Sequence, residues 1–330
     1  MPVGERARSR GLDRWPISET GSLISLPIVG HPAAPRADGK IAAMMHANPL
    51  PAQVLTLDDL HGIEAAALRH EVPCGDGAMV WHRWGEGAPV VLLHGGSGSW
   101  THWVRNIAAL VAAGHQAWIP DLPGFGDSAR PPAGGDADAL PGPMEAALQA
   151  LLGDAPVDLV GFSFGSMVAA FMAAQRPARV RRLVLCGAPA LGVEPAAPLV
   201  LKAWGHLPPG PALDAAHREN LARLMLARPE SIDALALAIH AANLPRDRMR
   251  LRRLSRTDVL LRTLREVRCP VWGIWGSEDV LYRGVADRIA PALAAAPDFR
   301  GLALVPGAGH WVQFEDAPAF DRALAAALAV

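Results

Sequence analysis

A serine stands in the sequence GFSFG at residues 161–165, directly after an apolar run and at the start of a segment with helical spacing. This pattern is typical of a tight strand-to-helix turn that exposes a hydroxyl, because only small residues fit on either side of such a turn. The helix that follows would direct its positive end toward a developing oxyanion. Ser163 is therefore the candidate nucleophile.

A serine hydroxyl needs a base to take its proton and a third group to orient that base. Of the 12 histidines, only His310 lies on a glycine-rich loop, GAGHW, directly after a late predicted strand. Asp279, in the sequence GSED after another predicted strand, is the candidate carboxylate, and its neighbour Glu278 is the alternative. The stretch that follows the predicted strand 180–186 contains no acid, which favours the GSED turn as the source of the carboxylate.

Short apolar runs alternate with longer segments of helical spacing from about residue 68 onward. The runs are bounded by Gly or Pro, and they lie at residues 90–93, 117–119, 157–160, 180–186, 271–275 and 302–305. The helical segments lie between them, at residues 100–113, 144–152, 164–175, 283–295 and 317–328. Runs that are apolar on both faces are typical of buried parallel strands. The alternation predicts βαβ units in a doubly wound sheet, with the half-polar segment 78–84 as an antiparallel edge strand.

The strand pattern stops between residues 189 and 267, where only helical patterning with proline breaks is present. We predict that residues 189–267 form an inserted helical cap, and that residues 51–188 and 268–330 form the core. Residues 1–50 contain Pro, Gly and Arg without a period and no apolar run long enough for a signal sequence. They are expected to be a loosely ordered extension of a cytoplasmic protein.

Composition excludes several classes of protein. Of the 330 residues, 51% are hydrophobic and 19% charged, which excludes a disordered chain, and no apolar run reaches the roughly 18 residues of a membrane span. A net charge of −1 leaves no basic surplus for binding nucleic acid. Cys74, Cys186 and Cys269 have unrelated spacings, so we expect buried thiols and neither a disulfide framework nor a metal site. We therefore expect a small-molecule substrate, no cofactor and no metal, and either a monomer or a homodimer.

The order Ser163, Asp279, His310, each after a predicted parallel strand, resembles the α/β-hydrolase superfamily. Two further motifs support the resemblance: HGGSG at residues 94–98 is similar to the family's H-G-x loop, and DLPGFGDS at residues 121–128 is similar to its D-x-P-G-x-G-x-S loop. The resemblance implies an α/β-hydrolase fold, a mostly parallel, doubly wound sheet of about eight strands with an inserted helical cap.

The same resemblance implies roles for individual residues. The N–H groups of Gly96 and Phe164 would form the oxyanion hole, and His94 would orient its loop. The family places Asp at the turn position of Asp279, which favours this residue over Glu278. Aromatic residues beside the motifs predict an apolar site, and the candidate pocket residues are Ser97, Trp100, Phe162 and Trp311.

Three functions remain open at this point. The leading interpretation is hydrolysis of a small-to-medium apolar carboxylic ester or lactone through an acyl-enzyme, because the bulky Phe162 removes a polar contact to a dienol or carboxylate. The nucleophilic serine argues against the epoxide hydrolases and haloalkane dehalogenases of the superfamily. The segment GHWVQFE at residues 309–315 is similar to that of the meta-cleavage product hydrolases, which break carbon–carbon bonds, although those enzymes typically have Asn where this chain has Phe162. The third interpretation is a non-catalytic ligand-binding protein on the same fold.

Overall fold

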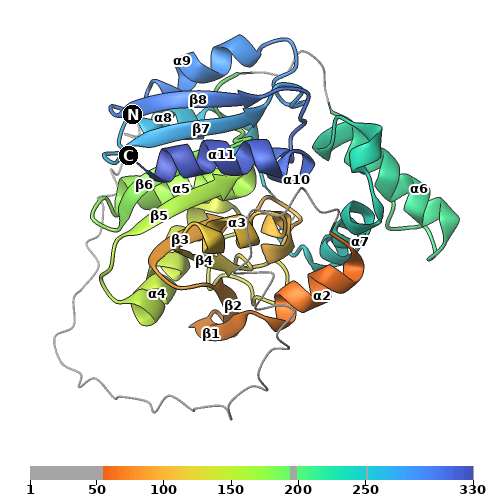
Figure 1. Ribbon diagram of the computed structural model, residues 1–330, viewed down its shortest axis with the longest axis horizontal. Helices are drawn as coiled ribbons and strands as arrows, with labels where there is room; N and C mark the ends of the chain where they lie inside the picture. Colours follow the sequence, from red (N-terminus) through yellow and green to blue (C-terminus); the bar gives the residue numbers. More distant parts are fainter. Residues whose placement is uncertain (1–54, 194–198, 250–251, 330) are drawn as a thin grey trace, which may run out of the picture. The chain divides into compact units, whose positions relative to one another are not determined.

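The computed structural model describes residues 55–193, 199–249 and 252–329, which all belong to one compact unit, Ala37–Val330. An eight-stranded sheet with the strand order β1-β2-β4-β3-β5-β6-β7-β8 is its centre (Figure 1). The strands are β1 (Leu68–Cys74), β2 (Gly77–Trp84), β3 (Ala88–Leu93), β4 (His115–Pro120), β5 (Val157–Phe162), β6 (Val180–Cys186), β7 (Val271–Gly276) and β8 (Phe299–Val305). Strands β3 to β8 pair in parallel, and β2 pairs antiparallel with β1 and β4. The predicted mostly parallel, doubly wound sheet is confirmed.

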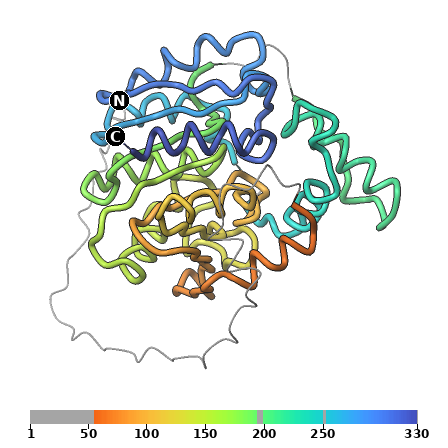
Figure 2. Tube along the Cα trace, viewed as in Figure 1, coloured from red at the N-terminus to blue at the C-terminus, as the bar shows by residue number. Residues whose placement is uncertain are grey.

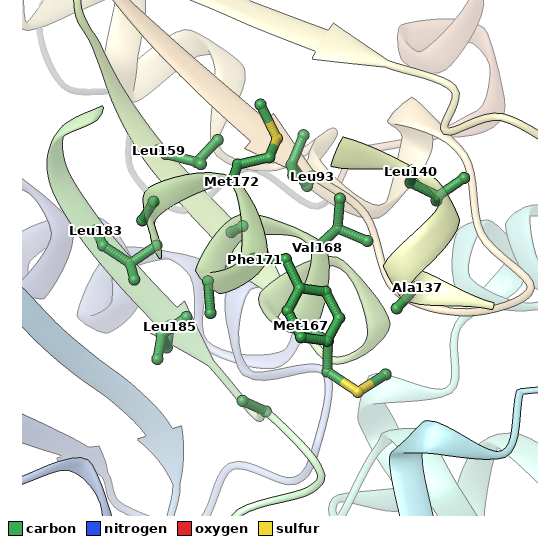
Figure 3. Close-up of a cluster of buried hydrophobic side chains, with 14 of the residues drawn as sticks. Leu93, Ala137, Leu140, Leu159, Met167, Val168, Phe171, Met172, Leu183 and Leu185 are labelled. Atoms are coloured by element: carbon green, nitrogen blue, oxygen red, sulfur yellow. The ribbon is translucent and has the colours of Figure 1, made fainter. Parts of the chain in front are cut away.

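Helices cover both faces of this sheet. One face carries α4 (Pro141–Leu152), α5 (Phe164–Gln175), α8 (Val259–Leu264) and α9 (Ile289–Leu293), and the other carries α3 (Ile107–Ala112) and α11 (Ala317–Leu328). Successive residues of a strand point to opposite faces. Val91 and Leu93 accordingly belong to the first hydrophobic cluster, and Val90 and Leu92 to the second. Figure 3 shows Leu183 and Leu185 of β6 beside the side chains of α5.

The stretch between β6 and β7, residues 189–267, is here called the inserted segment. Its described part contains α6 (Pro211–Asn220), the π-helical turn η3 (Leu221–Met225), η4 (Pro229–Ser231), α7 (Ala234–Asn243), η5 (Leu244–Arg246), η6 (Leu254–Arg256) and α8. Figures 1 and 2 show α6 and α7 together beside the sheet, with α7 next to α2 (Leu57–Ala65). Helix α8, in contrast, packs against α5 in the first hydrophobic cluster. The C-terminal part of the inserted segment therefore belongs to the layer of helices that covers the sheet.

Several sequence expectations are met outside the sheet, and others are not tested. All three cysteines are buried and free, as predicted. The predicted extension, residues 1–50, lies outside the described residues. The predicted helix 100–113 is instead divided into η1 (Trp100–Trp103) and α3. The side chain of Asn106, between them, donates to the Gln313 carbonyl and to Asp321. Throughout the part of the chain that the structure describes, every helix is too short or too polar to cross a bilayer.

Replacement of Leu183 by Ala tests the core of the sheet. Leu183 is fully buried, whereas Leu304 on β8 is 45% exposed. We expect Leu183→Ala to lower the free energy of unfolding by about 2–5 kcal/mol, because it leaves a cavity that the packed layers cannot close. Leu304→Ala is the matched control and should change it by less than about 0.5 kcal/mol. Urea unfolding followed by circular dichroism measures both; equal effects would contradict the described packing.

Candidate active site

Ser163 stands in a strained turn between β5 and α5. Its backbone angles are φ +50° and ψ −115°, a left-handed conformation that costs a non-glycine residue about 1–3 kcal/mol. The turn is tight enough to require both neighbouring glycines. A Cβ atom on Gly161 would lie 2.6 Å from the carbonyl oxygen of Gly165, and a Cβ on Gly165 would lie 2.4 Å from that of Leu93. The GFSFG sequence therefore holds the hydroxyl at the carboxyl end of β5.

The structure brings Ser163, His310 and Asp279 into one hydrogen-bonded chain. His310 Nε2 lies 3.0 Å from Ser163 Oγ, and His310 Nδ1 lies 2.9 Å from Asp279 Oδ2. An ionised carboxylate only accepts hydrogen bonds, so Nδ1 carries the proton and Nε2 is free to accept the proton of the serine. The carboxylate of Glu278 instead accepts a hydrogen bond from Ser277. The GSED turn thus presents Asp279, and not its neighbour, to the imidazole.

Two main-chain N–H groups lie where the sequence predicts an oxyanion hole. Phe164 is the first residue of α5, and an amide at the first turn of a helix has no partner within the helix. Gly96 lies on the loop after β3, and among the described residues its amide donates no hydrogen bond. Whether this pair binds an oxyanion depends on how the Gly96 amide is held.

Two histidines hold Gly95, the residue before Gly96, at its carbonyl and at its amide. The amide of Leu122 donates to His94 Nε2, so the proton of His94 is on Nδ1, which donates to the carbonyl oxygen of Gly95 at 2.8 Å. The amide of Gly95 donates to His102 Nδ1 at 3.3 Å. Because a peptide group is planar, fixing the Gly95 carbonyl also fixes the direction of the Gly96 N–H.

His102 was not among the residues that the sequence singled out. Its ring packs so closely against the loop that a Cβ on Gly98 would lie 2.3 Å from His102 Cε1. Burial lowers the pKa of His102 well below its usual value and that of His94 to about 4. Both rings are therefore neutral at pH 7, which each needs in order to accept a hydrogen bond from a main-chain amide. No sequence pattern predicts this role of His102, because its contact with the loop exists only in the folded chain.

Of the predicted pocket residues, the structure brings only Ser97 to the open pocket beside the site. This pocket has a volume of about 700 Å³. Besides Ser97, its lining comes from the inserted segment: Leu201, Lys202, Ala203, Trp204, Gly205, Asn220, Leu224, His240, Leu244, Pro245, Asp247 and Arg252. Trp100 packs on Trp84, Phe162 lies under Gly95 beside His310, and Trp311 stacks on Phe314. These three aromatic residues are buried in the second hydrophobic cluster.

A charged group occupies the end of the pocket nearest the oxyanion loop. Arg252 donates to Asp247 at 2.7 Å and to Ser97 Oγ at 3.1 Å, and Ser97 donates to Asp247 at 2.6 Å. A Cβ atom on Gly96 would lie 3.1 Å from the guanidinium carbon of Arg252. A cation thus lies directly against one of the two candidate oxyanion donors. Ser97 has a left-handed backbone, with φ +52°.

The described residues contain no cluster of three or more His, Cys, Asp or Glu side chains that could hold a metal ion. The groups gathered at the site are a hydroxyl, an imidazole, a carboxylate and two main-chain donors.

Comparison with known proteins identifies the family of this chain. The family model for the alpha/beta hydrolase fold matches residues 88–223. A 2-hydroxy-6-oxo-6-phenylhexa-2,4-dienoate hydrolase of Burkholderia cepacia is 32% identical over 260 residues, which cover 72% of this chain and 86% of the relative. The chain is a member of the α/β-hydrolase superfamily. A 2-hydroxy-6-oxononadienedioate/2-hydroxy-6-oxononatrienedioate hydrolase of Cupriavidus pinatubonensis is 30% identical over 253 residues, 71% of this chain and 84% of the relative.

Solved α/β hydrolases have the same architecture. An esterase from Rhodococcus sp. ECU1013 superposes with a TM-score of 0.64 at 25% identity and covers 78% of this chain and 97% of its own. A serine hydrolase involved in carbazole degradation superposes with a TM-score of 0.62 at 21% identity, covering 80% of this chain and 99% of its own. The predicted α/β-hydrolase fold is thereby confirmed, and the relatives support hydrolytic activity.

The depressed pKa of His94 predicts a pH dependence of stability. In the unfolded chain His94 titrates near 6.5, and in the folded chain near 4. Between these values the unfolded chain binds the extra proton, so stability is fully present above pH 6.5 and falls by about 3 kcal/mol as the pH drops to 4. We expect His94→Asn to be less stable at pH 7 but to lose less stability on acidification. Urea unfolding at pH 7, 6 and 5 measures the difference; parallel curves for the two proteins would refute it.

Proposed function

We propose that this protein is a serine hydrolase in which Ser163 is the nucleophile, His310 the general base and Asp279 the residue that orients the imidazole. The observation that carries the proposal is the hydrogen-bonded chain of 3.0 and 2.9 Å through the two ring nitrogens of His310. His310 takes the proton of Ser163 as the oxygen attacks a carbonyl carbon, and Asp279 stabilises the resulting imidazolium.

The negative charge that develops on the carbonyl oxygen is bound by the amides of Gly96 and Phe164. Removing one such donor typically costs about 3–4 kcal/mol of transition-state stabilisation. The imidazolium then gives its proton to the leaving atom, and the bond to the leaving group breaks, which leaves an acyl group on Ser163. Water, deprotonated by His310, hydrolyses this acyl-enzyme and restores the serine.

For the substrate we propose a 2-hydroxy-6-oxo-dienoate, whose carbon–carbon bond next to the ketone is cleaved. The two relatives described above are hydrolases of such dienoates, at 32% and 30% identity. Arg252 lies against Gly96 at the end of the pocket. It is paired with Asp247 through one nitrogen and bonded to Ser97 through another, and its remaining N–H groups would bind a substrate carboxylate. When the carbon–carbon bond breaks, the carbonyl carbon stays on Ser163 as the acyl group and the electron pair passes to the dienoate. His310 delivers its proton to the dienoate carbon that was bonded to the carbonyl carbon.

A carboxylic ester or lactone is the second candidate substrate. Phe162 favours it, because its buried ring occupies the position where meta-cleavage product hydrolases typically carry a polar Asn. The structural similarity to the Rhodococcus esterase also favours an ester substrate. The triad would act in the same manner, with an alcohol oxygen as the leaving atom.

Replacement of Ser163 tests the proposed nucleophile. We expect Ser163→Ala to lower kcat by about three orders of magnitude or more on any substrate that the wild type hydrolyses, and to abolish labelling by a fluorophosphonate. Ser231→Ala, on η4 of the inserted segment, is the control and should retain both properties. Undiminished labelling of Ser163→Ala would show that Ser163 is not the nucleophile. Saturable ligand binding by a wild type without turnover on dienoates or esters would favour the non-catalytic interpretation.

Replacement of Arg252 separates the two substrate classes. Hydrogen bonds to charged groups contribute about 1.5–3 kcal/mol, so Arg252→Gln should raise KM for a 2-hydroxy-6-oxo-dienoate at least tenfold. KM for a neutral p-nitrophenyl ester should change far less, and the exposed Arg256→Gln should change neither. Bleaching of the coloured dienoate measures the first activity and release of p-nitrophenol the second. Turnover of esters without any bleaching would assign the enzyme to the ester class.

A further inference from the structure

Glu315 is a buried carboxylate with no part in the triad. It is the last residue of the short helix α10 (Val312–Glu315), and only 7% of its surface is exposed. Its oxygens accept three main-chain hydrogen bonds, from Gly309 at 2.5 Å, from Arg228 at 2.7 Å and from Ala227 at 3.0 Å. A buried carboxylate is costly unless its lone pairs are satisfied, and these three amides satisfy them.

The three amides come from two separate parts of the chain. Gly309 directly precedes His310, whereas Ala227 and Arg228 belong to the inserted segment. The two parts also meet without the carboxylate: the amide of Trp311 donates to the carbonyl of Met225 at 2.7 Å. Glu315 therefore joins the loop that carries the imidazole to residues 225–228 of the inserted segment.

Residues 225–228 are continuous with the wall of the pocket. The turn η3 is π-helical, with the amide of Leu226 donating to the carbonyl of Leu221. Leu224 of this turn lines the pocket, and the next residue, Met225, bonds to the amide of Trp311. A π-helical turn inside a helical stretch often marks a functional site. Adjacent residues of one turn thus face the substrate pocket and hold the His310 loop.

We propose that Glu315 is a positioning residue that holds His310 in line with Ser163 by binding the His310 loop to residues 227 and 228 of the inserted segment. This inference rests on the proposed triad. A carboxylate is suited to the task because both of its oxygens accept, whereas an amide at the same place has one accepting oxygen and a nitrogen that would face an N–H donor. The inserted segment then serves the chemical step as well as substrate binding.

Glu315→Gln and Gly309→Ala test the two sides of this contact. In Gly309→Ala the new Cβ would lie 2.8 Å from the amide nitrogen of Ala227 and 3.1 Å from Glu315 Oε2, so it separates the same two parts while the carboxyl group itself is retained. We expect each variant to lower kcat and the rate constant of fluorophosphonate labelling at least tenfold, with KM changed less than threefold. Neither residue lines the pocket, which is why KM should be retained.

Glu145→Gln is the matched control for a loss of stability alone. Glu145 on α4 binds the buried Arg179 at 3.0 Å, in contact with neither the pocket nor the triad. Its replacement should lower the unfolding midpoint and leave kcat and labelling unchanged at a temperature where all proteins are folded. If Glu315→Gln does not fold, Gly309→Ala decides by the same measurements.

Two results would overturn the proposal: unchanged kcat and labelling in the folded variants, or a rise of KM at constant kcat, which would limit the contact to shaping the pocket. Failure of the triad itself has a different signature. In that case Ser163→Ala would keep wild-type turnover and labelling, whatever the Glu315 variants do.

Discussion

The close approach of the β5–α5 turn to the end of β3 is the constraint on which the site depends. Gly165 leaves room for the carbonyl oxygens of Leu93 and His94, each of which a Cβ would approach to 2.5 Å or less. This contact sets the distance between the nucleophile and the oxyanion loop. It brings the Phe164 amide, at the start of a helix, next to the loop that carries Gly96, so one packing contact positions both the hydroxyl and the two amides that we propose bind the oxyanion.

The sheet and the triad could be predicted because their signals are local. Strands β3 to β7 are largely buried and, like the more exposed edge strand β8, appear in the sequence as short apolar runs, and Ser163, Asp279 and His310 each follow one of these runs. Strand β1 contains no such run, because Arg69, His70 and Glu71 interrupt its apolar residues and four of its seven residues are exposed at the edge of the sheet. Helix α8 shares the helical pattern of the inserted segment, and its packing against α5 depends on contacts that no local pattern contains.

The pocket and the residues that hold the loops could not be predicted for the same reason. Trp100, Phe162 and Trp311 lie beside the motifs in sequence, but large apolar side chains gain most by complete burial, and they pack into the core. The polar end of the pocket pairs Ser97 with Asp247, which is 150 residues away. His102 and Glu315 bind main-chain atoms. Every residue except proline has a main-chain N–H group, so the residue type of the partner does not reveal such a contact in the sequence.

The inserted segment leaves and re-enters the sheet at two neighbouring parallel strands, with Cys186 of β6 paired to Ile274 of β7. The free energy of closing a loop grows only slowly with its length, so segments of other lengths could be exchanged at this point without disturbing the strand register. The contact with Glu315 limits that freedom. A segment transplanted from another hydrolase must bring main-chain donors to the positions of Ala227 and Arg228. An exchange of this segment that alters substrate specificity therefore also alters the position of His310 unless these donors are retained.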